Sequence, residues 1–437
     1  MQTIKKYWQQ IALFAVALIT RLYLLSIFDV ELSQDGFEAV RTLTILQTQG
    51  ASAVPRDLLD RFILHPFYML LLGTLRILTP ASSDFYFIAR LLSTIIACIA
   101  VIILFEFVRR AYGVVAAWIA ALFLAFAPTF LWESVAILSS TTFLALYLAV
   151  LLALQSSRYR PAALLAFLST LTRYEGVVLI ALVFIALFIH DIRARKFIFA
   201  DWVIAVVCAL AFPITMMLTG LLASGNALEF LGANSMAAIW LRFLAPGDFA
   251  KRAQFFLTNY SALLPSAIIW LGAMGAVVVL IWHRHRTTGL LIGTSALYLI
   301  FFEALVWLNY TTLETRFLMY PGLPIIVFAA VAMSQVAWYY QHADFLGRLR
   351  VFVLIVLGTL LFLFQSYQQG DAGLQYIYKS QASMRQMADE LAQILPKNQR
   401  VNVLAYGGTS GALDMFARRN NLDLAFTEFR FAPDDNP

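Results

Sequence analysis

Four carboxylates crowd into one short stretch of this 437-residue chain. Asp29, Glu31, Asp35 and Glu38 fall within ten residues, directly after an apolar run, although only 13% of all residues are charged. Ionisable groups held beside lipid are costly, so they indicate function by default. A partly desolvated carboxylate has a raised pKa, which suits it to accept a proton from a hydroxyl group. Asp35 is therefore a candidate general base, and Glu38 is a second candidate.

A structural interpretation of the same stretch stays open beside the functional one. The segment Asp35-Gly-Phe-Glu38 matches a capping box, with Asp35 as the N-cap and Glu38 as the third residue of a helix. The apolar residues that follow recur at helical spacing and predict a stripe on a surface-lying helix, formed by Phe37, Val40, Leu43 and Leu46. A capping box does not explain why Asp29 and Glu31 come just before it.

Two arginines have the type and setting for binding phosphate. Arg173 in "LTRYEGVV" and Arg316 in "LETRFLMYP" lie between apolar residues, each near a glutamate, Glu175 and Glu314. The planar guanidinium can hold two phosphate oxygens at once. The alternative is an ion pair within each loop, or arginines that reach toward the membrane interface.

A polar knot follows at the segment "WESVAILSS". It combines Glu133 with four hydroxyls at the start of an apolar run, Ser139, Ser140, Thr141 and Thr142. Helix capping is the expected task of the hydroxyls. The five histidines form no metal-ligand cluster, and the two cysteines, Cys98 and Cys208, lie inside apolar runs as packing residues.

The elements that position these residues must be membrane helices. Hydrophobic residues make up 61% of the chain and the mean hydropathy is +0.78, whereas about a quarter of an ordinary globular chain is charged. This composition indicates an all-α polytopic membrane protein. The net charge of +6 is a matter of membrane topology and does not indicate a nucleic-acid partner.

Apolar runs of spanning length predict most of the transmembrane helices. They lie near residues 8–28, 86–108, 114–132, 138–154, 198–222, 256–282, 288–308, 317–339 and 349–367. Two stretches are ambiguous. Residues 62–79 are barely long enough to span, and residues 162–190 are too long for one helix and are interrupted by "RYEG" at 173–176.

The distribution of basic residues decides between the possible topologies. If 62–79 lies on the outer surface and 162–190 forms two short helices, six basic clusters fall on the cytoplasmic side. These clusters are Lys5/Lys6, Arg109/Arg110, Arg158/Arg160, Arg193/Arg195/Lys196, Arg284/Arg286 and Arg348/Arg350. We therefore expect about eleven transmembrane helices, a cytoplasmic N-terminus and an extracytoplasmic C-terminus.

This topology gathers the polar segments on the outer face and defines two domains. Residues 1–367 form the transmembrane domain, with a first outer loop at 29–85 and a second at 223–255. Residues 368–437 form a small extracytoplasmic α/β tail. The tail is predicted as a helix (381–395), a strand (400–405), a helix (411–419) and a strand (422–427).

Several segments, taken in order, resemble the GT-C membrane glycosyltransferases. Within that superfamily the chain is most similar to the group of protein O-mannosyltransferases and lipid A aminoarabinose transferases. "LHPFYMLLLGTLRIL", "LSTLTRYEGVVLI" and "ETRFLMYPGLPIIVFAA" resemble segments of that group, and the likeness spans roughly residues 8–370. The chain departs from the pattern at Asp35-Gly36, where Asp-Glu is frequent, and at His65-Pro66-Phe67, where His-Pro-Pro is frequent.

The resemblance implies an inverting transfer of a sugar from a polyprenyl-phosphate donor to a hydroxyl of a lipid, glycan or protein. Asp35 would be the general base, and Arg316 and Arg173 would meet the phosphate. The supporting contacts would come from Glu38, His65, Glu175 and Glu133. No metal is required, although the acidic loop could hold a divalent ion. The reaction would take place on the outer face of a bacterial or archaeal plasma membrane.

Two other classes of function compete with this one. A transporter would need charged residues in mid-membrane or an inverted repeat, and the chain shows neither pattern. A non-catalytic subunit of a membrane complex would keep the fold and lose one acid, as the Asp35-Gly36 departure allows. A ligase for a whole oligosaccharide is less favoured, since the outer soluble part is small.

Overall fold

The protein is an integral membrane protein built from packed helices. The computed structural model describes residues 2–28, 31, 33–50, 65–80, 84–195, 197–228, 260, 264–282, 286–307, 315–342, 346–347, 353, 357–358, 361–362, 364–366, 368, 385–395, 400–406 and 423–429. Within these residues, six helices are long and apolar enough to cross a membrane, or seven if one bent pair counts as a span. The total of eleven spans stays a prediction.

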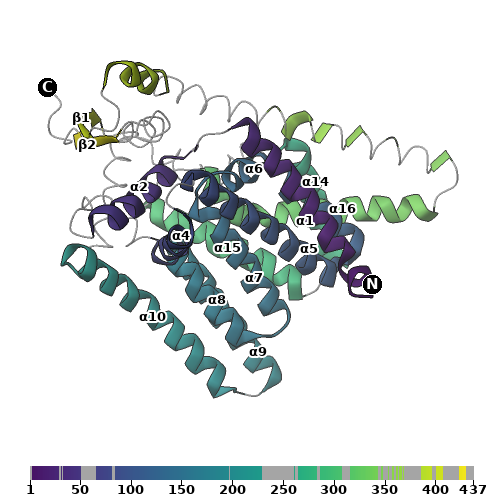
Figure 1. Cartoon of the computed structure of the whole chain (residues 1–437). Helices are drawn as coiled ribbons and strands as arrows, with labels where there is room; N and C mark the ends of the chain where they lie inside the picture. The colour runs from purple at the N-terminus through teal and green to yellow at the C-terminus, as the bar shows by residue number, and fades with distance from the viewer. Residues whose placement is uncertain are drawn as a thin grey trace.

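The described helices are packed against one another in a bundle (Figure 1). The first part contains α1 (Gln2–Ile27), α2 (Gln34–Gln49), α4 (Pro66–Leu78), α5 (Phe85–Ala125), α6 (Pro128–Ser134), α7 (Ser139–Gln155) and α8 (Tyr159–Thr172). The second part contains η2 (Tyr174–Gly176), α9 (Val177–Ala194), α10 (Phe199–Ser224), α14 (Ser266–Trp282), α15 (Arg286–Trp307), η3 (Thr315–Leu318) and α16 (Met319–His342).

The ambiguous stretch 162–190 does form two helices. Helices α8 and α9 are separated at "RYEG" by the single turn of η2, as predicted. Gly176 ends that turn against the backbone of α8. A Cβ at this position would lie 2.5 Å from the carbonyl carbon of Ser169. A larger residue therefore cannot occupy the turn without moving it away from α8.

The predicted spans 86–108 and 114–132 are both present, but the second one ends earlier than predicted. They meet within α5 at Gly113, which breaks the helix with φ 89°, a value that favours glycine. The second half stops at Ala125, and Pro128 then begins the separate helix α6. Proline suits the first turn of a helix, because a backbone N–H group at that position would have no partner within the helix.

Helices α6 and α7 form a bent pair with an angle of 114° between them. The connection, residues 135–138, is called the elbow below, and its four residues are at most 1% exposed. The elbow is therefore irregular backbone inside the protein. Such backbone needs hydrogen-bond partners from neighbouring elements.

Most of the buried apolar side chains form one core between α5, α7, α8, α9 and α16. Close approach of α14 to α16 depends on small residues. A Cβ on Gly272 would lie 2.8 Å from the carbonyl oxygen of Ile325, and one on Gly275 would meet that of Phe328. Small residues at a helix interface allow this contact in membranes, where burial of apolar surface supplies no drive for association.

A second region of packing joins α2, α4 and the elbow. The predicted stripe of α2 is confirmed, since Phe37, Val40 and Leu43 are at most 6% exposed. Val40 and Leu43 pack in one cluster with Met69 of α4 and with Ile137 of the elbow, among others. In Figure 1, α2, α4 and α6 lie near one another, and the turn from α9 to α10 lies at the opposite end.

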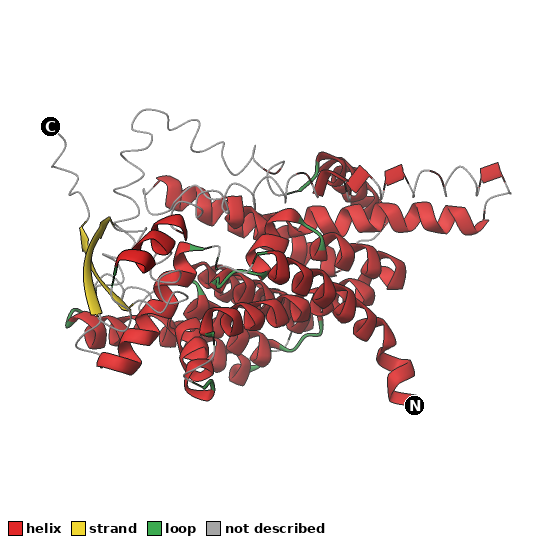
Figure 2. Ribbon diagram, turned by 45° about the horizontal axis from the view of Figure 1, so that its top comes forward, coloured by secondary structure: helices red, strands yellow, loops and turns green. Residues whose placement is uncertain are grey.

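The predicted strands of the tail are present. Strand β1 (Arg400–Tyr406) pairs in parallel with β2 (Asp423–Phe429), with Arg400 opposite Asp423. Figure 2 shows the two strands at one edge of the helical bundle. The helical stretch 385–394 buries Ala388 in a cluster with Leu25, Phe37 and Val135. The predicted helix 411–419 lies outside the described residues, and the domain boundary after 367 stays a prediction.

Candidate functional site

The elbow is held by polar side chains of α5. The Nε of Arg90 donates to the carbonyl oxygen of Val135 over 2.7 Å, and the hydroxyl of Thr94 donates to that of Ser134 over 3.0 Å. Arg90 is 1% exposed and Thr94 is fully buried. These bonds satisfy backbone carbonyls that the break between α6 and α7 leaves without a helical partner.

Glu31 binds the other side of the elbow. Its Oε1 accepts hydrogen bonds from the backbone N–H of Ile137 at 3.0 Å, and from the N–H and hydroxyl of Ser33 at 3.0 and 2.6 Å. Its Oε2 lies 3.8 Å from the Nε of Arg90, and both side chains are at most 1% exposed. Burial raises the pKa of the Glu31 carboxyl, and Arg90 opposes that shift. Glu31 thus clamps the first loop to the elbow.

Ser33, and not Asp35, caps α2. The hydroxyl of Ser33 accepts from the N–H of Gly36 at 3.0 Å, so Asp35 lies inside the first turn. The predicted capping box is therefore wrong, because Glu31 fixes Ser33 in the capping position. The same clamp explains Gly36, since a Cβ there would lie 2.5 Å from Oε1 of Glu31. A glutamate after Asp35 would require the side chains of Glu31 and Ser33 to move.

Asp35 and Glu38 are half-buried on α2, whose apolar residues pack against α4. Burial raises the pKa of the Tyr68 phenol of α4, and the negative charges of Glu31 and Asp35 act in the same direction. Tyr68 therefore stays protonated near Asp35. Asp29 lies outside the described residues.

Arg173 and Glu175 form a buried ion pair. Nη2 of Arg173 lies 2.7 Å from Oε1 of Glu175, and its Nε lies 3.1 and 3.2 Å from the two carboxylate oxygens. The side chains are 4% and 0% exposed. The guanidinium carbon lies 5.4 Å from the centre of the Phe317 ring in η3. Of the two interpretations of Arg173, the structure therefore contains the ion pair.

The polar knot joins the elbow to this ion pair. Nη1 of Arg173 donates to the hydroxyl of Ser139, the first residue of α7, at 3.3 Å. The hydroxyl of Thr141 donates to the backbone carbonyl of Glu133 at 3.2 Å, and Glu133 is 3% exposed. The expected capping is thus wrong for Ser139 and Thr141, because these hydroxyls bridge separate elements. The N-cap position of α7 is Leu138, which has no side-chain cap hydrogen bond.

His65 brings α4 to the same place. Its Nδ1 lies 2.8 Å from the backbone oxygen of Thr172, the residue directly before Arg173. His65 is the N-cap of α4, and Pro66 opens that helix. Arg316 belongs to η3 next to Phe317, and its side chain lies outside the described part, as does Glu314.

The structure brings several of the predicted residues together, gives Glu31 a structural role, and adds Arg90, which the sequence analysis did not single out. His65 contacts the end of α8 directly before Arg173, and hydroxyls of α7 bind both Arg173 and the backbone of Glu133. Asp35 and Glu38 lie on α2, which packs beside the elbow. Glu31 clamps the first loop, and Arg90 is its buried partner. A signal existed for Arg90, since an arginine inside the apolar run "FIARLLST" needs a partner.

Within the described residues, no group of three or more His, Cys, Asp or Glu side chains could hold a metal ion. Glu31 is engaged by Arg90, and Glu175 by Arg173. These two carboxylates therefore bind cations of the protein itself.

Comparison with protein-family models and with curated protein sequences finds no match. Comparison with solved structures finds ArnT from Cupriavidus metallidurans bound to undecaprenyl phosphate, with a TM-score of 0.61 and 15% identity over 96% of this chain and 86% of ArnT. AglB from Archaeoglobus fulgidus, in complex with an inhibitory peptide and a dolichol-phosphate, has a TM-score of 0.58 and 14% identity over 96% of this chain and 64% of AglB.

The Archaeoglobus fulgidus oligosaccharyltransferase in complex with Zn and sulfate is similar too, with a TM-score of 0.52 and 15% identity over 94% of this chain and 62% of that one. ArnT and AglB are GT-C membrane glycosyltransferases. At these sequence identities the similarity is one of fold, and it covers nearly the whole of this chain. The protein therefore has the GT-C fold.

Proposed function

We propose that the protein is a glycosyltransferase that moves a sugar from a polyprenyl-phosphate donor to a hydroxyl acceptor at the outer membrane surface. The observation that carries this proposal is the likeness of nearly the whole chain to ArnT, whose structure contains undecaprenyl phosphate. The position of Asp35 supports it, because α2 begins just after the first spanning helix. A bacterial or archaeal plasma membrane is the setting that we infer.

In the proposed reaction Asp35 takes the proton from the acceptor hydroxyl. The acceptor oxygen then attacks the anomeric carbon, and the bond from that carbon to the phosphate oxygen breaks. The bonding electrons leave with the polyprenyl phosphate, and direct displacement inverts the anomeric configuration. General-base catalysis of this kind is worth about 10²- to 10⁴-fold in rate.

The leaving phosphate gains negative charge and needs cations. We assign this role to Arg316, with Arg173 as a second contact through the N–H groups that Glu175 and Ser139 do not use. Because its charge is already balanced by Glu175, Arg173 contributes mainly by holding Phe317, the neighbour of Arg316. Glu38, His65 and Glu133 are proposed as supporting contacts.

No step of the proposed reaction uses a metal. The Archaeoglobus enzyme has a structure with zinc and sulfate, so a divalent ion remains compatible with the fold. The acceptor class (lipid, glycan or protein) is open to experiment, and AglB has a structure with an inhibitory peptide. The other partners that we propose are the surrounding membrane lipids.

The test is donor consumption by the purified full chain in nanodiscs, with a panel of polyprenyl-phosphate sugars and acceptors. We expect turnover by wild type and a loss of at least about 100-fold in Asp35→Asn. Glu38→Gln, one helical turn away, is the matched control and should lose less. Equal turnover in wild type and Asp35→Asn would remove Asp35 from the chemistry. Absence of both donor binding and turnover would favour the non-catalytic subunit.

A further inference from the structure

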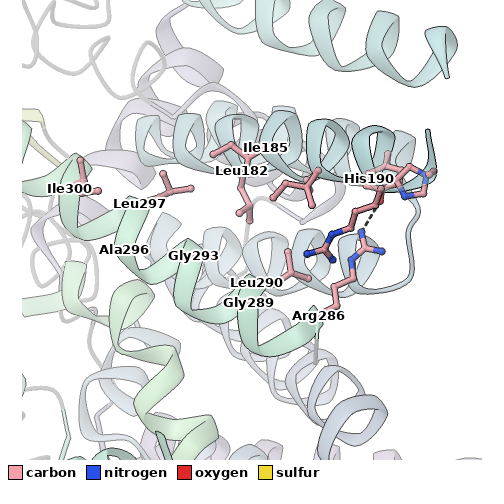
Figure 3. Close-up of a pocket in the computed structure, with 15 residues that line it drawn as sticks. Leu182, Ile185, His190, Arg286, Gly289, Leu290, Gly293, Ala296, Leu297 and Ile300 are labelled. Carbon is pink, nitrogen blue, oxygen red and sulfur yellow. Dashed lines mark hydrogen bonds between the residues drawn. The ribbon is translucent and has the colours of Figure 1, made fainter. Parts of the chain in front are cut away.

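We propose a second lipid site in this protein, a groove between α9 and α15 that binds an anionic phospholipid. The groove has a volume of about 790 Å³ and is lined by both helices and by Tyr159 of α8. Figure 3 shows Leu182, Ile185 and His190 from one helix facing Leu290 and Leu297 from the other. The inference does not depend on glycosyl transfer.

One end of the groove is basic. Nη2 of Arg286 donates to the hydroxyl of Tyr159 at 2.7 Å, the bond dashed in Figure 3, and Nη1 donates to the hydroxyl of Ser157 at 2.5 Å. The ring of His190 lies 5.0 Å from that of Tyr159. Arg193, in the last turn of α9, also lines the groove and is exposed. Within the described residues, its side chain makes neither a hydrogen bond nor an ion pair.

The described acids near this end are engaged elsewhere. Asp191 accepts from the indole N–H of Trp202 at 2.6 Å, and Asp201 pairs with Arg160 at 2.7 Å. In addition, α15 begins at Arg286, so its N-terminal N–H groups, which favour anions, point to this end. The negative end of the α9 dipole is met by Arg193 in the same turn. This basic end of the groove, called the mouth below, therefore suits a phosphate group.

The rest of the groove is apolar and open. Gly289 and Gly293 line it, and a Cβ at either position would meet no atom within 4 Å. Glycine inside a helix costs about 0.5–1 kcal/mol relative to alanine, and here no contact with the protein requires it. The two glycines thus leave space that an acyl chain can fill. From Arg286 to Ile300 the groove extends along α15 for about 21 Å, more than half of the ~30 Å hydrocarbon core.

The basic mouth belongs to the leaflet opposite the candidate active site. Helix α9 starts beside Glu175, runs for 18 residues, or about 27 Å, and ends at Ala194 next to Arg193. It is one of the helices long enough to span the membrane. A lipid in this groove would therefore come from the other membrane surface, where basic pockets between helices attract anionic headgroups.

Native mass spectrometry of the full chain in neutral detergent tests the proposal, with phosphatidylglycerol, phosphatidylcholine of the same acyl chains, and glycerol 3-phosphate as probes. We expect phosphatidylglycerol to bind at least tenfold more tightly than phosphatidylcholine. Arg193→Gln, which removes the charge of an exposed side chain, should weaken the binding of phosphatidylglycerol about tenfold. Gly289→Leu/Gly293→Leu should abolish binding of both lipids. Gly358→Leu, another position with open space around its Cβ, should leave binding unchanged.

Three results would overturn the proposal. Equal binding of the two lipids, or no effect of Arg193→Gln, would remove the headgroup site. Displacement of phosphatidylglycerol by glycerol 3-phosphate alone would make it a site for free anions. A change in oligomeric mass in Gly289→Leu/Gly293→Leu, with lipid binding intact, would assign the groove to a second copy of the chain. If that double variant does not fold, the Arg193→Gln result decides.

Discussion

The two ends of the helical bundle use the same kind of ion pair in opposite surroundings. At the candidate active site, Arg173 grips Glu175 with exposures of 4% and 0%. At the far end, Arg109 and Arg110 both contact Glu106 at 2.8 and 2.7 Å, with the arginines 41% and 43% exposed and the glutamate 19%. The chemistry is equal, and the difference lies in access to water.

That difference separates positioning from solvation. Removing two charges from water costs several kcal/mol per ion, so a buried pair is weak evidence for stability and fits a requirement for fixed geometry. An exposed pair contributes only about 0–1 kcal/mol. We infer that the pair at "RYEG" holds α8, α7 and η3 in register.

Breaking the buried pair from one side should have the largest effect. Arg173→Met leaves the Glu175 carboxylate buried without its cation, which should lower the free energy of unfolding in detergent by about 3–5 kcal/mol. Chemical denaturation measures this loss. Arg173→Met/Glu175→Met is the control and should recover most of the stability. Equal losses in the single and double variants would contradict the role of the pair.

The next effect concerns close backbone contact at the same end. Gly176→Ala should cost about 1–3 kcal/mol, because its methyl group meets the α8 backbone at Ser169 and Thr170. The far end offers the matched control in Gly289→Ala. That position is open and helical, so the change should stabilise the protein by about 0.5–1 kcal/mol. Melting temperatures that move in the same direction would refute the contrast between the ends.

A smaller effect is expected at the cap of α2. Ser33→Ala removes the bond to the N–H of Gly36 and one of the bonds to Glu31, which should cost about 0.5–2 kcal/mol. Ser26→Ala, at an exposed hydroxyl of α1, should stay within about 0.5 kcal/mol of wild type. If both changes cost the same, Ser33 does not organise the first loop.

The smallest effect belongs to the far end. Glu106→Gln removes two ion pairs at once, yet we expect a loss of no more than about 1 kcal/mol. The loss should shrink further at high salt, where exposed pairs are screened. A loss comparable to that of Arg173→Met would mean that exposure does not distinguish the two ends.

The sequence was informative where the signal is local. The interruption at "RYEG" fixed the boundary between α8 and α9, and helical spacing found the buried stripe of α2. The strands of the tail begin within a residue of their predicted starts. Each of these features depends on residues close to one another in the chain.

The predictions were wrong where a residue's role depends on a partner that is distant in the sequence. The cap of α2 is Ser33 because Glu31 reaches Ile137, more than a hundred residues away in sequence. Ser139 serves Arg173 for a similar reason. Spacing in the chain carries no information on such pairs, so the capping box at Asp35 and the capping hydroxyls of α7 looked equally plausible. Only charged residues inside apolar runs, such as Arg90, hinted at them.

The elbow also has a bearing on biosynthesis. The ribosome delivers the chain from its N-terminus, so early segments are in place before later ones emerge. The side chains that bind the elbow's backbone from the first loop and α5 are Glu31, Ser33 and Arg90, and all of them precede it in the sequence. When the break between α6 and α7 leaves the translocation channel, the side chains that bind its backbone have therefore already been synthesised. We therefore expect the backbone polar groups of the elbow to form their hydrogen bonds as the segment enters the membrane.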